Sequence, residues 1–302
     1  MAKVKGVICS GAVIHDTLVR PVEQPQWGTT TIVDTIEPHL GGNAANTSIA
    51  LATLGVPVRV VAMVGRDDHG RFVLDALTDR GVDTTAVAAV DSPTAATVGL
   101  INTAGSRMFL HRPCAGFTAP FDFPPQLTQG MSHYHLASLF ILPDFRPHAA
   151  ATLARARAAG LTTSLDTNWD PRGAWMTDLA PCLPDLDFLF MNEDEARMLG
   201  AAPAAIVYRG VGAVVVKLGP RGCAVYTADR EILSPAFDVP VKDTTGAGDC
   251  FVAGFLAAYL RGANFEAAAR FANAVGALSV QCVGATAGLR NLAQTELWAN
   301  GR

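Results

Sequence analysis

The chain has 302 residues, of which 50% are hydrophobic and 17% are charged, and its formal net charge at pH 7 is −4. This composition supports a sizeable buried core and gives no basic surface for nucleic acid or an acidic membrane, so neither is expected as a partner. No apolar run reaches the roughly 18 residues of a membrane span, and the N-terminal apolar stretch is too short for a signal peptide. We expect one cytoplasmic domain that covers residues 1–302.

The cysteines give no pattern typical of disulfides or of zinc binding. None forms a Cys-x-x-Cys pair, and their spacing is unlike that of zinc sites. A chain of this length builds enough core without disulfide bonds, so we expect free thiols in a reducing cytosol. The six thiols belong to Cys9, Cys114, Cys182, Cys223, Cys250 and Cys282.

Apolar runs and their periodicity predict strands and helices that mostly alternate along the chain. Strands are expected at residues 4–11, 58–65, 133–138, 161–168, 187–192, 212–219 and 222–227. Helices are expected at residues 43–55, 68–81, 146–160, 193–200, 247–261 and 264–284. The alternation predicts an α/β fold, with a mostly parallel central sheet and helices on both faces. Ligand-binding loops then gather at the carboxyl ends of the strands.

Two further segments do not fit this alternation of strands and helices. Residues 29–36 are rich in β-branched side chains and alternate, as in a half-exposed strand. Residues 95–102 and 106–111 form a predicted hairpin with a glycine in its turn. We expect these segments to build a small β-sheet lid from roughly residues 17–38 and 94–113.

The stretch DTTGAGDCFVAGFLAAYL places small residues and a carboxylate at the start of a long apolar helix. A helix that begins near Ala247 leaves its first N–H groups unpaired, and glycines let a ligand approach the backbone closely. With the helix dipole, Gly246, Ala247 and Gly248 would form an anion site suited to phosphate. Asp249 would repel phosphate unless it orients, or accepts a proton from, a hydroxyl that attacks phosphorus. The alternative is a first-turn acid favoured by the dipole, after glycines that only form a turn.

Two other nucleotide-binding motifs are absent from the sequence. The phosphate loop of the Walker type needs a Gly-Lys pair, which does not occur. The segments that begin at Gly210 and Gly246 lack the third glycine of the dinucleotide-binding fingerprint. A Rossmann dehydrogenase is therefore disfavoured, although the predicted sheet would allow it.

Two motifs far apart in the chain resemble the ribokinase-like, or PfkB, family of sugar and nucleoside kinases. They are GGNAANTSIALATLGVPVRVVAMVGRDDHG at residues 41–70 and DTTGAGDCFVAGF at residues 243–255, and the resemblance covers nearly the whole chain. It implies a three-layer ribokinase-like fold with a small β-sheet lid. It also implies ATP- and Mg²⁺-dependent phosphorylation of a hydroxyl, usually a primary alcohol of a sugar-like substrate, and a homodimer clasped by the lid.

The family's catalytic and substrate-binding residues match positions of this sequence. Asp249 matches the catalytic base, and Gly246, Ala247 and Gly248 match the anion hole that stabilises the transferred phosphoryl group. Substrate contacts would come from a carboxylate, two glycines and two amides, namely Asp16, Gly41, Gly42, Asn43 and Asn46. For Asn46, a polar residue at a helix start is an equal alternative.

The same resemblance assigns the nucleotide side of the site. Asn192 and Glu195, in an Asn-x-x-Glu element, would order Mg²⁺ and its waters near the phosphates, and an acid-rich helix start is the alternative. The residues that would surround ATP are Lys217, Gly219, Gly222, Asn273, Gly284 and Ala285. Lys217 either approaches a phosphate or is only a strand-end charge. Asp243 and Thr245 match a monovalent-cation site of many members, so potassium is a candidate activator.

Several features depart from the family or stay open. Asn43 replaces the lysine of many ribokinases, which argues against ribose, and CAGF at residues 114–117 replaces the family's Gly-Ala-Asn. The run of four glycines of the phosphofructokinase branch is absent, which argues against fructose 6-phosphate. His133 and His135 share a strand face without an evident third metal ligand, so we expect a structural role. One strand end carries two side chains that either hold substrate or organise the metal's water shell, Asp166 and Asn168.

We therefore predict an ATP- and Mg²⁺-dependent carbohydrate kinase that transfers phosphate in line to a hydroxyl of a sugar or sugar acid. The alternative within the family is a nucleoside kinase, which would need an aromatic sandwich for its base, from Phe109 or Phe117. A non-catalytic sugar-binding protein is disfavoured by the intact Gly-Ala-Gly-Asp, because a sensor needs no base.

Overall fold

The computed structural model describes residues 4–113 and 118–301, and its largest element is a nine-stranded sheet ordered β13-β12-β11-β10-β9-β8-β1-β4-β5. The strands from β11 to β5 are parallel, and β12 and β13 extend the β11 edge in antiparallel fashion, so the prediction of a mostly parallel sheet is confirmed. The bounds are β1 Gly6–Ser10, β4 Val58–Gly65, β5 Asp83–Val90, β8 Met131–Leu136, β9 Thr162–Asp166, β10 Phe188–Asn192, β11 Ala213–Lys217, β12 Cys223–Tyr226 and β13 Glu231–Ser234.

The central strands are apolar along their whole length because both of their faces are covered. In β1, Val7 and Cys9 pack into the core on one face of the sheet, and Ile8 packs into the core on the other. In β10, Phe190 and Leu189 divide between the same two cores. Side chains alternate in this way because successive residues of a strand point to opposite faces.

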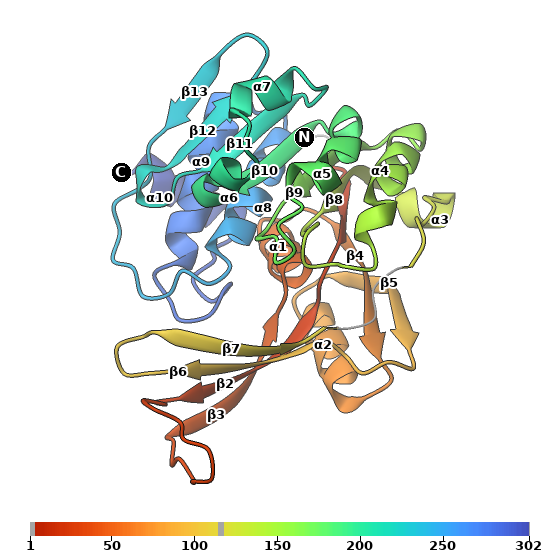
Figure 1. Ribbon diagram of the computed structural model, residues 1–302. Coiled ribbons are helices and arrows are strands. Elements are labelled where there is room, and N and C mark those ends of the chain that lie inside the picture. Colours follow the sequence, from red (N-terminus) through yellow and green to blue (C-terminus); the bar gives the residue numbers. More distant parts are fainter. Residues whose placement is uncertain (1–3, 114–117, 302) are drawn as a thin grey trace.

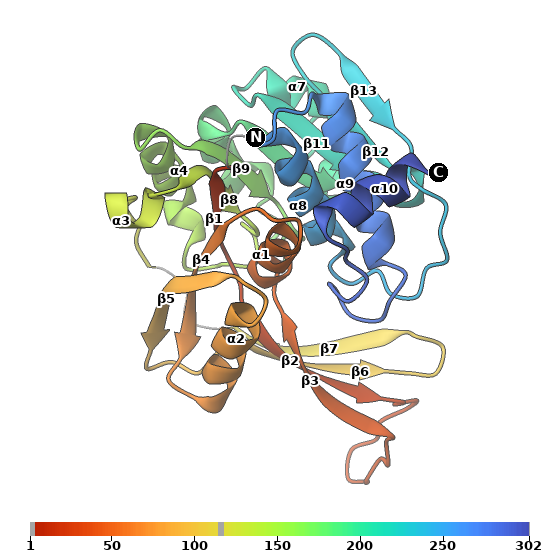
Figure 2. The same ribbon diagram turned by 180° about the vertical axis from the view of Figure 1, so that it is seen from behind.

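Helices cover both faces of the sheet and give three layers (Figure 1, Figure 2). One face carries α1 Asn43–Thr53, α2 Asp68–Thr78, α8 Ala247–Tyr259 and α9 Phe265–Ser279, with α10 Leu292–Asn300 beside α9. The other face carries α3 Pro125–Thr128, α4 Ala149–Ala158, α5 Met176–Leu179, α6 Glu193–Met198 and α7 Pro203–Val207. Short 3₁₀ turns are η1 Arg146–His148, η2 Ala180–Asp185 and η3 Gly219–Arg221.

A second sheet of four strands, here called the small sheet, projects from the layered body (Figure 1). Its order is β3-β2-β6-β7, with β2 Ile14–Arg20, β3 Thr35–Gly41, β6 Ala96–Ile101 and β7 Arg107–Arg112. β6 and β7 form the predicted antiparallel hairpin, and β2 pairs in parallel with β6 and in antiparallel with β3. The expected small separate sheet is confirmed, whereas its role as a lid stays a prediction.

Two sequence-based boundaries are wrong, and three strands were missed. The strand expected at residues 29–36 begins only at Thr35, since its partner β2 ends before Pro21, which has no N–H to extend the ladder. The helix expected at residues 264–284 ends at Ser279, because the Val280 carbonyl accepts the N–H groups of residues 242 and 243 instead. Strands β2, β5 and β13 were not predicted, because the polar residues within them obscure the apolar pattern of a strand.

Two expectations from composition can be compared with the structure. Within residues 4–113 and 118–301, no helix is both long and apolar enough to span a bilayer. The cysteines of the same ranges are free thiols, and four of them are buried, namely Cys9, Cys182, Cys223 and Cys250. Cys114 lies outside the described residues.

A buried ion pair fixes the connection that follows β9. Arg146 Nη2 donates to Asp170 Oδ1 at 2.6 Å, and these side chains are 3% and 0% exposed. Asp170 also accepts the N–H groups of Arg172 and Trp175 at 2.9 and 2.8 Å. Burial alone would raise the pKa of Asp170, but these hydrogen bonds and the guanidinium lower it. The carboxylate therefore fastens a loop at the carboxyl edge of the sheet.

We predict that Asp170→Ala lowers the free energy of unfolding by about 3–5 kcal/mol, because it removes the buried carboxylate partner of Arg146, which keeps only the more exposed Asp178, and also removes the acceptor of two backbone N–H groups. Urea denaturation at neutral pH measures the change. The matched control is Asp194→Ala, which removes the exposed pair with Arg197 and should cost less than about 1 kcal/mol. The pKa of Asp170 is lower in the folded than in the unfolded protein. Its contribution to the free energy of unfolding is therefore complete above the unfolded-state pKa and is lost as the pH falls through the folded-state pKa. Equal losses in the two variants would contradict this role.

Candidate active site

The N-terminus of α8 is open to a ligand. Gly246 caps this helix in the left-handed conformation, with φ 68°, and offers no side-chain acceptor. A Cβ at this position would lie 2.5 Å from the Cβ of Ala285, so glycine is required by both conformation and space. Within the described residues, the N–H groups of Gly248 and Asp249 meet no acceptor. Free N–H groups at the start of a helix attract anions.

Asp249 lies in the first turn of α8, is 6% exposed, and is held by the start of α1. Asn43 Nδ2 donates to its Oδ1 at 2.9 Å, and Asn46 Nδ2 donates to its Oδ2 at 2.8 Å. Burial raises the pKa of Asp249, and the two amides and the Lys217 ammonium oppose that rise. The two asparagines expected to contact a substrate thus contact the expected base. Each carboxylate oxygen has a second lone pair, so Asp249 can still accept a hydroxyl proton.

A first cavity of about 600 Å³ lies between the small sheet and the layered body, within the range of about 300–1,000 Å³ usual for small-molecule sites. Its wall includes the side chain of Phe109, which is 54% exposed. The predicted site residues that line the first cavity are Asp16, Gly41, Gly42, Asn46, Asp243, Thr245, Gly284 and Ala285.

Asp16 brings a carboxylate from β2 to the wall of the first cavity. A Cβ at position 41 would lie 2.0 Å from Asp16 Oδ2, so glycine leaves room for that carboxylate. Burial raises the pKa of Asp16, and the Thr97 hydroxyl and His39 oppose the rise. A hydrogen-bond acceptor is thus available on the small-sheet side of the first cavity.

A second cavity of about 560 Å³ lies on the other side of the α8 N-terminus. The predicted site residues that line it are Lys217, Gly219, Gly222, Ala247, Gly248 and Asn273. Asn273 Nδ2 also donates to the carbonyls of Ser234 and Pro235 at 3.0 and 3.2 Å, which fastens the segment after β13 to α9. Gly284 and Ala285, expected at an adenine pocket, line the first cavity instead, because the Gly284 N–H bonds to Asp243 Oδ2 at 2.9 Å.

Lys217 ends β11 and places an ammonium beside the α8 N-terminus. Its Nζ donates to Asp166 Oδ2 at 2.6 Å and lies 3.2 Å from the place that a Cβ on Gly248 would take. Burial alone would lower the pKa of Lys217, but the carboxylates of Asp166, Glu195 and Asp249 raise it overall. The amine is therefore protonated at neutral pH, at the border of the second cavity.

Asn192 and Glu195 form a capping box at the start of α6. The Glu195 N–H donates to Asn192 Oδ1, and the Asn192 N–H donates to Glu195 Oε2, both at 2.8 Å. Glu195 is 5% exposed, and its Oε2 also accepts the Thr167 hydroxyl at 2.9 Å. Neither residue of the box lines the two cavities. The start of α6 is rich in acidic residues, and the carboxylate of one of them, Glu195, points into the protein.

The turn at residues 243–245, expected to hold a monovalent cation, receives a guanidinium. Arg107 Nη2 donates to Asp243 Oδ1 at 2.6 Å, and Arg107 Nη1 donates to the Thr245 hydroxyl. Burial alone would raise the pKa of Asp243, but hydrogen bonds from Gly284, Thr245 and Arg107 lower it to about 2. Sequence analysis missed Arg107 because it lies 136 residues before Asp243, and only the β6–β7 hairpin brings the two together.

Other residues singled out by the sequence lie outside these contacts. His133 Nε2 and His135 Nδ1 each lie 2.7 Å from the Ser164 hydroxyl in the core. Burial lowers the pKa of His133 to about 3 and that of His135 well below its usual value, so both are neutral at pH 7. The described residues contain no cluster of histidine, cysteine or carboxylate side chains suited to a metal. Phe117 and the CAGF segment lie outside the described residues.

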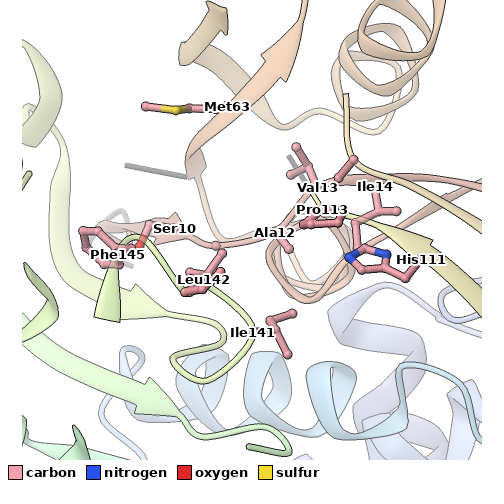
Figure 3. A pocket seen from close by; sticks show the side chains of 13 residues that line it. Ser10, Ala12, Val13, Ile14, Met63, His111, Pro113, Ile141, Leu142 and Phe145 are labelled. Carbon is pink, nitrogen blue, oxygen red and sulfur yellow. The ribbon is translucent and has the colours of Figure 1, made fainter. Parts of the chain in front are cut away.

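A third hollow, of about 50 Å³, lies near the carboxyl end of β1 (Figure 3). Its wall is mostly apolar, with Val13 and Ile14 leading into the small sheet, Ile141 and Leu142 following β8, and His111 from β7. It is far smaller than the sites that hold small molecules. We assign no ligand to it.

Comparison with known proteins supports one family. The description "pfkB family carbohydrate kinase" matches residues 5–292. An ATP-dependent ribose-1-phosphate kinase of Halopiger xanaduensis is 33% identical over 288 residues, which cover 92% of this chain and 93% of that protein. A nucleoside kinase of Methanothermobacter thermautotrophicus is 26% identical, with 93% and 91% covered. The solved Arabidopsis thaliana ribokinase complexed with ribose and ATP has a TM-score of 0.86 and 25% identity, with 98% and 99% covered.

The family match and the first of these relatives both extend over nearly the whole chain, and the solved ribokinase shares its layered body and small separate sheet. The resemblance inferred from two sequence motifs is confirmed. The chain belongs to the pfkB family of carbohydrate kinases and has the ribokinase-like fold.

Proposed function

We propose that this kinase transfers the γ-phosphoryl group of ATP to a hydroxyl of a sugar or sugar-derived acceptor, with Asp249 as base. The observation that carries the proposal is the position of residues 243–249 between the two cavities. Asp243 and Thr245 line the first cavity, while Ala247 and Gly248 line the second. A kinase must bring its acceptor and ATP together at the γ-phosphoryl group, and residues 243–249 lie where ligands of the two cavities would come into contact.

The first cavity suits a polyol acceptor. Asp16 accepts hydrogen bonds there, as sugar hydroxyls require, and Asn46 links the first cavity directly to Asp249. Arg20 and Lys242 also line it, and within the described ranges no side-chain partner is found for Lys242. Since the Halopiger xanaduensis relative is named as a ribose-1-phosphate kinase, acceptors that carry an anionic group belong among the candidates.

We assign ATP to the second cavity, which lies on the other side of the α8 N-terminus from the first cavity. The Arabidopsis thaliana ribokinase complexed with ribose and ATP supports ATP as the phosphoryl donor. The free N–H groups of Gly248 and Asp249 would donate hydrogen bonds to the oxygens of the moving phosphoryl group, and the Lys217 ammonium would add a positive charge beside it. Asn273 would border the nucleotide indirectly, because its amide is already engaged by the segment after β13.

The carboxylates near Lys217 fit a magnesium ion that keeps most of its waters. Asp166 Oδ1 is buried without a hydrogen-bond partner among the described residues, and Glu195 lies close enough to influence the same group. Hard oxygen ligands and retained waters are what Mg²⁺ prefers. When bound, the ion would supply neutralising charge to the phosphates.

The chemical step then follows from the geometry. The acceptor oxygen forms a bond to the γ-phosphorus as the bond from phosphorus to the β–γ bridging oxygen breaks, and the hydroxyl proton passes to Asp249. Asn43 and Asn46 keep the carboxylate oriented while leaving lone pairs for that proton. The small sheet, closed over the first cavity, would act as the lid that keeps water from competing with the acceptor.

We also propose a homodimer formed through the outer face of the small sheet. Ile36, Val19, Leu100 and Met108 form one row of paired positions across the four strands. Ile36 is 66% exposed and Met108 is 49% exposed, so much of this apolar row is uncovered. An uncovered apolar sheet face is typical of a protein–protein contact.

An assay of ATP consumption over a panel of acceptors tests the proposed function. The panel holds free sugars, sugar acids, sugar phosphates and nucleosides. We expect turnover with one or more of the sugar-derived acceptors. Turnover with nucleosides alone would favour the nucleoside kinase, for which Phe109 in the first cavity is the available aromatic side chain. Sugar binding without any ATP turnover would support a sensor.

We predict that Asp249→Asn lowers kcat on the order of 10²–10⁴-fold, because the amide cannot take the hydroxyl proton. Binding of ATP, measured by calorimetry, should change little, since Asp249 is not among the residues that line the second cavity. Normal turnover in this variant would refute the assignment of the base.

We predict that the acidic limb of kcat/KM lies above the usual Asp pKa, because burial raises the pKa of Asp249. Activity should be lost as the pH falls through that raised value, at which the base becomes protonated. Asn43→Ala removes a hydrogen bond that opposes the rise, so the limb should move to higher pH. A pH–rate profile of both proteins checks this, and a limb that moves to lower pH would contradict it.

We predict that Lys217→Met lowers kcat by roughly 10²-fold or more, the range for loss of one electrostatic group at a developing charge. It also leaves Asp166 buried without its partner, so stability is measured in parallel. The double variant Lys217→Met with Asp166→Asn removes that orphan charge. If the double variant recovers full kcat, the ammonium serves the fold and has no part in phosphoryl transfer.

A further inference from the structure

The turn at residues 243–245, which the family resemblance assigns to a monovalent cation, already has a positive charge beside it in this chain. Asp243 Oδ1 accepts Arg107 Nη2 at 2.6 Å and the Thr245 N–H at 2.8 Å. Its Oδ2 accepts the Gly284 N–H at 2.9 Å. The Thr245 hydroxyl, a further oxygen of the turn, also faces the guanidinium. These residues do not fit an additional cation, since the guanidinium already balances the charge of the Asp243 carboxylate and would repel a second cation at the same turn.

The pair is screened from water more than a surface ion pair is. The side chain of Arg107 is 26% exposed and that of Asp243 is 9% exposed. Most other ion pairs of arginine in the described residues are more open, as in Arg66 with Asp91 at 67% and 97%. A charge pair withdrawn from water interacts more strongly and is less weakened by salt.

The contact also joins two parts of the fold that are far apart in sequence. Arg107 is the first residue of β7 in the small sheet, whereas Asp243 and Thr245 directly precede Gly246, the cap of α8. The guanidinium therefore spans the first cavity from the small sheet to the turn that shapes the α8 N-terminus. Arg112 at the other end of β7 donates to the Thr94 carbonyl and, among residues 4–113 and 118–301, makes no such bridge.

We propose that Arg107 replaces the monovalent cation at the turn of residues 243–245, so that phosphoryl transfer by this enzyme needs no potassium. The inference rests on the proposed function, because it concerns the same phosphoryl site. Arg107 is a positioning residue: it acts through Asp243 and Thr245 on the free N–H groups of the α8 N-terminus. Because the guanidinium belongs to β7, the small sheet that walls the first cavity also supplies the positive charge of the turn.

The kinetic test compares chloride salts of choline, sodium and potassium at one ionic strength, about 0.1 M, so that screening is constant. Wild-type kcat should be the same in all three salts. Arg107→Met should lose on the order of tenfold to hundredfold in kcat in choline, the usual effect of removing an outer partner of a site. Potassium, but not choline, should restore part of that loss. Arg107→Lys should lose less, and the matched control Arg112→Met should gain no potassium response.

A second test does not depend on turnover. The Tm of each protein is measured as potassium replaces choline, since a cation that binds only the folded state raises Tm. Arg107→Met should gain a potassium-dependent rise in Tm that the wild type lacks. Crystals of Arg107→Met in rubidium chloride should show anomalous density beside Asp243, and wild-type crystals should show none there.

These outcomes separate the inference from the proposed function. A wild type that needs potassium for turnover, or an Arg107→Met variant with neither a kinetic nor a melting response to potassium, overturns the role of Arg107. A wild type that turns over no acceptor in any salt overturns the proposed function. In that case the melting and rubidium measurements still decide whether the guanidinium occupies a cation site.

Discussion

Two amides from α1 hold the carboxylate of Asp249 at the start of α8, and the site is built around that interaction. Asn43 and Asn46 occupy successive inward positions near the α1 N-terminus, so one helix end presents both donors to the other. The polar atoms lie in a protein interior where an unpaired carboxylate would be costly. The packing of α1 against α8 therefore fixes the position of the Asp249 carboxylate. The first and second cavities lie on either side of the α8 N-terminus.

The charges around this carboxylate oppose one another at short range. Lys217 lies between Asp166 and the α8 N-terminus, and Glu195 is buried nearby, so the charges of this cluster shift the pKa values of Asp166, Lys217 and Asp249. Farther from Asp249, the guanidinium of Arg107 balances the negative charge of Asp243. A side chain of another residue thus donates a hydrogen bond to each of the four carboxylates, namely Asp166, Glu195, Asp243 and Asp249. Because these donors offset negative charge, the α8 N-terminus can attract an anion although Asp166, Glu195 and Asp249 lie close to it.

The local parts of this site could be predicted from the sequence, and the long-range parts could not. The turn at Gly246 and the first-turn position of Asp249 follow from adjacent residues, because glycine permits the left-handed conformation and an apolar helical run comes directly after it. The bonds from Asn43 and Arg107 join segments more than a hundred residues apart, and no periodicity encodes them. Likewise the parallel sheet was evident from repeated apolar runs, whereas β2 was hidden by polar residues such as Asp16 that serve the first cavity.

The most direct test is a crystal structure with ADP, Mg²⁺, aluminium fluoride and the acceptor that the turnover assay identifies. We predict that the fluoride complex, standing for the moving phosphoryl group, meets the N–H groups of Gly248 and Asp249. The acceptor hydroxyl should lie in the first cavity within hydrogen-bond reach of the Asp249 carboxylate, about 2.6–3.2 Å. An acceptor bound elsewhere, or an Asp249 that still faces only Asn43 and Asn46 while the fluoride complex lies away from α8, would contradict the proposed chemistry.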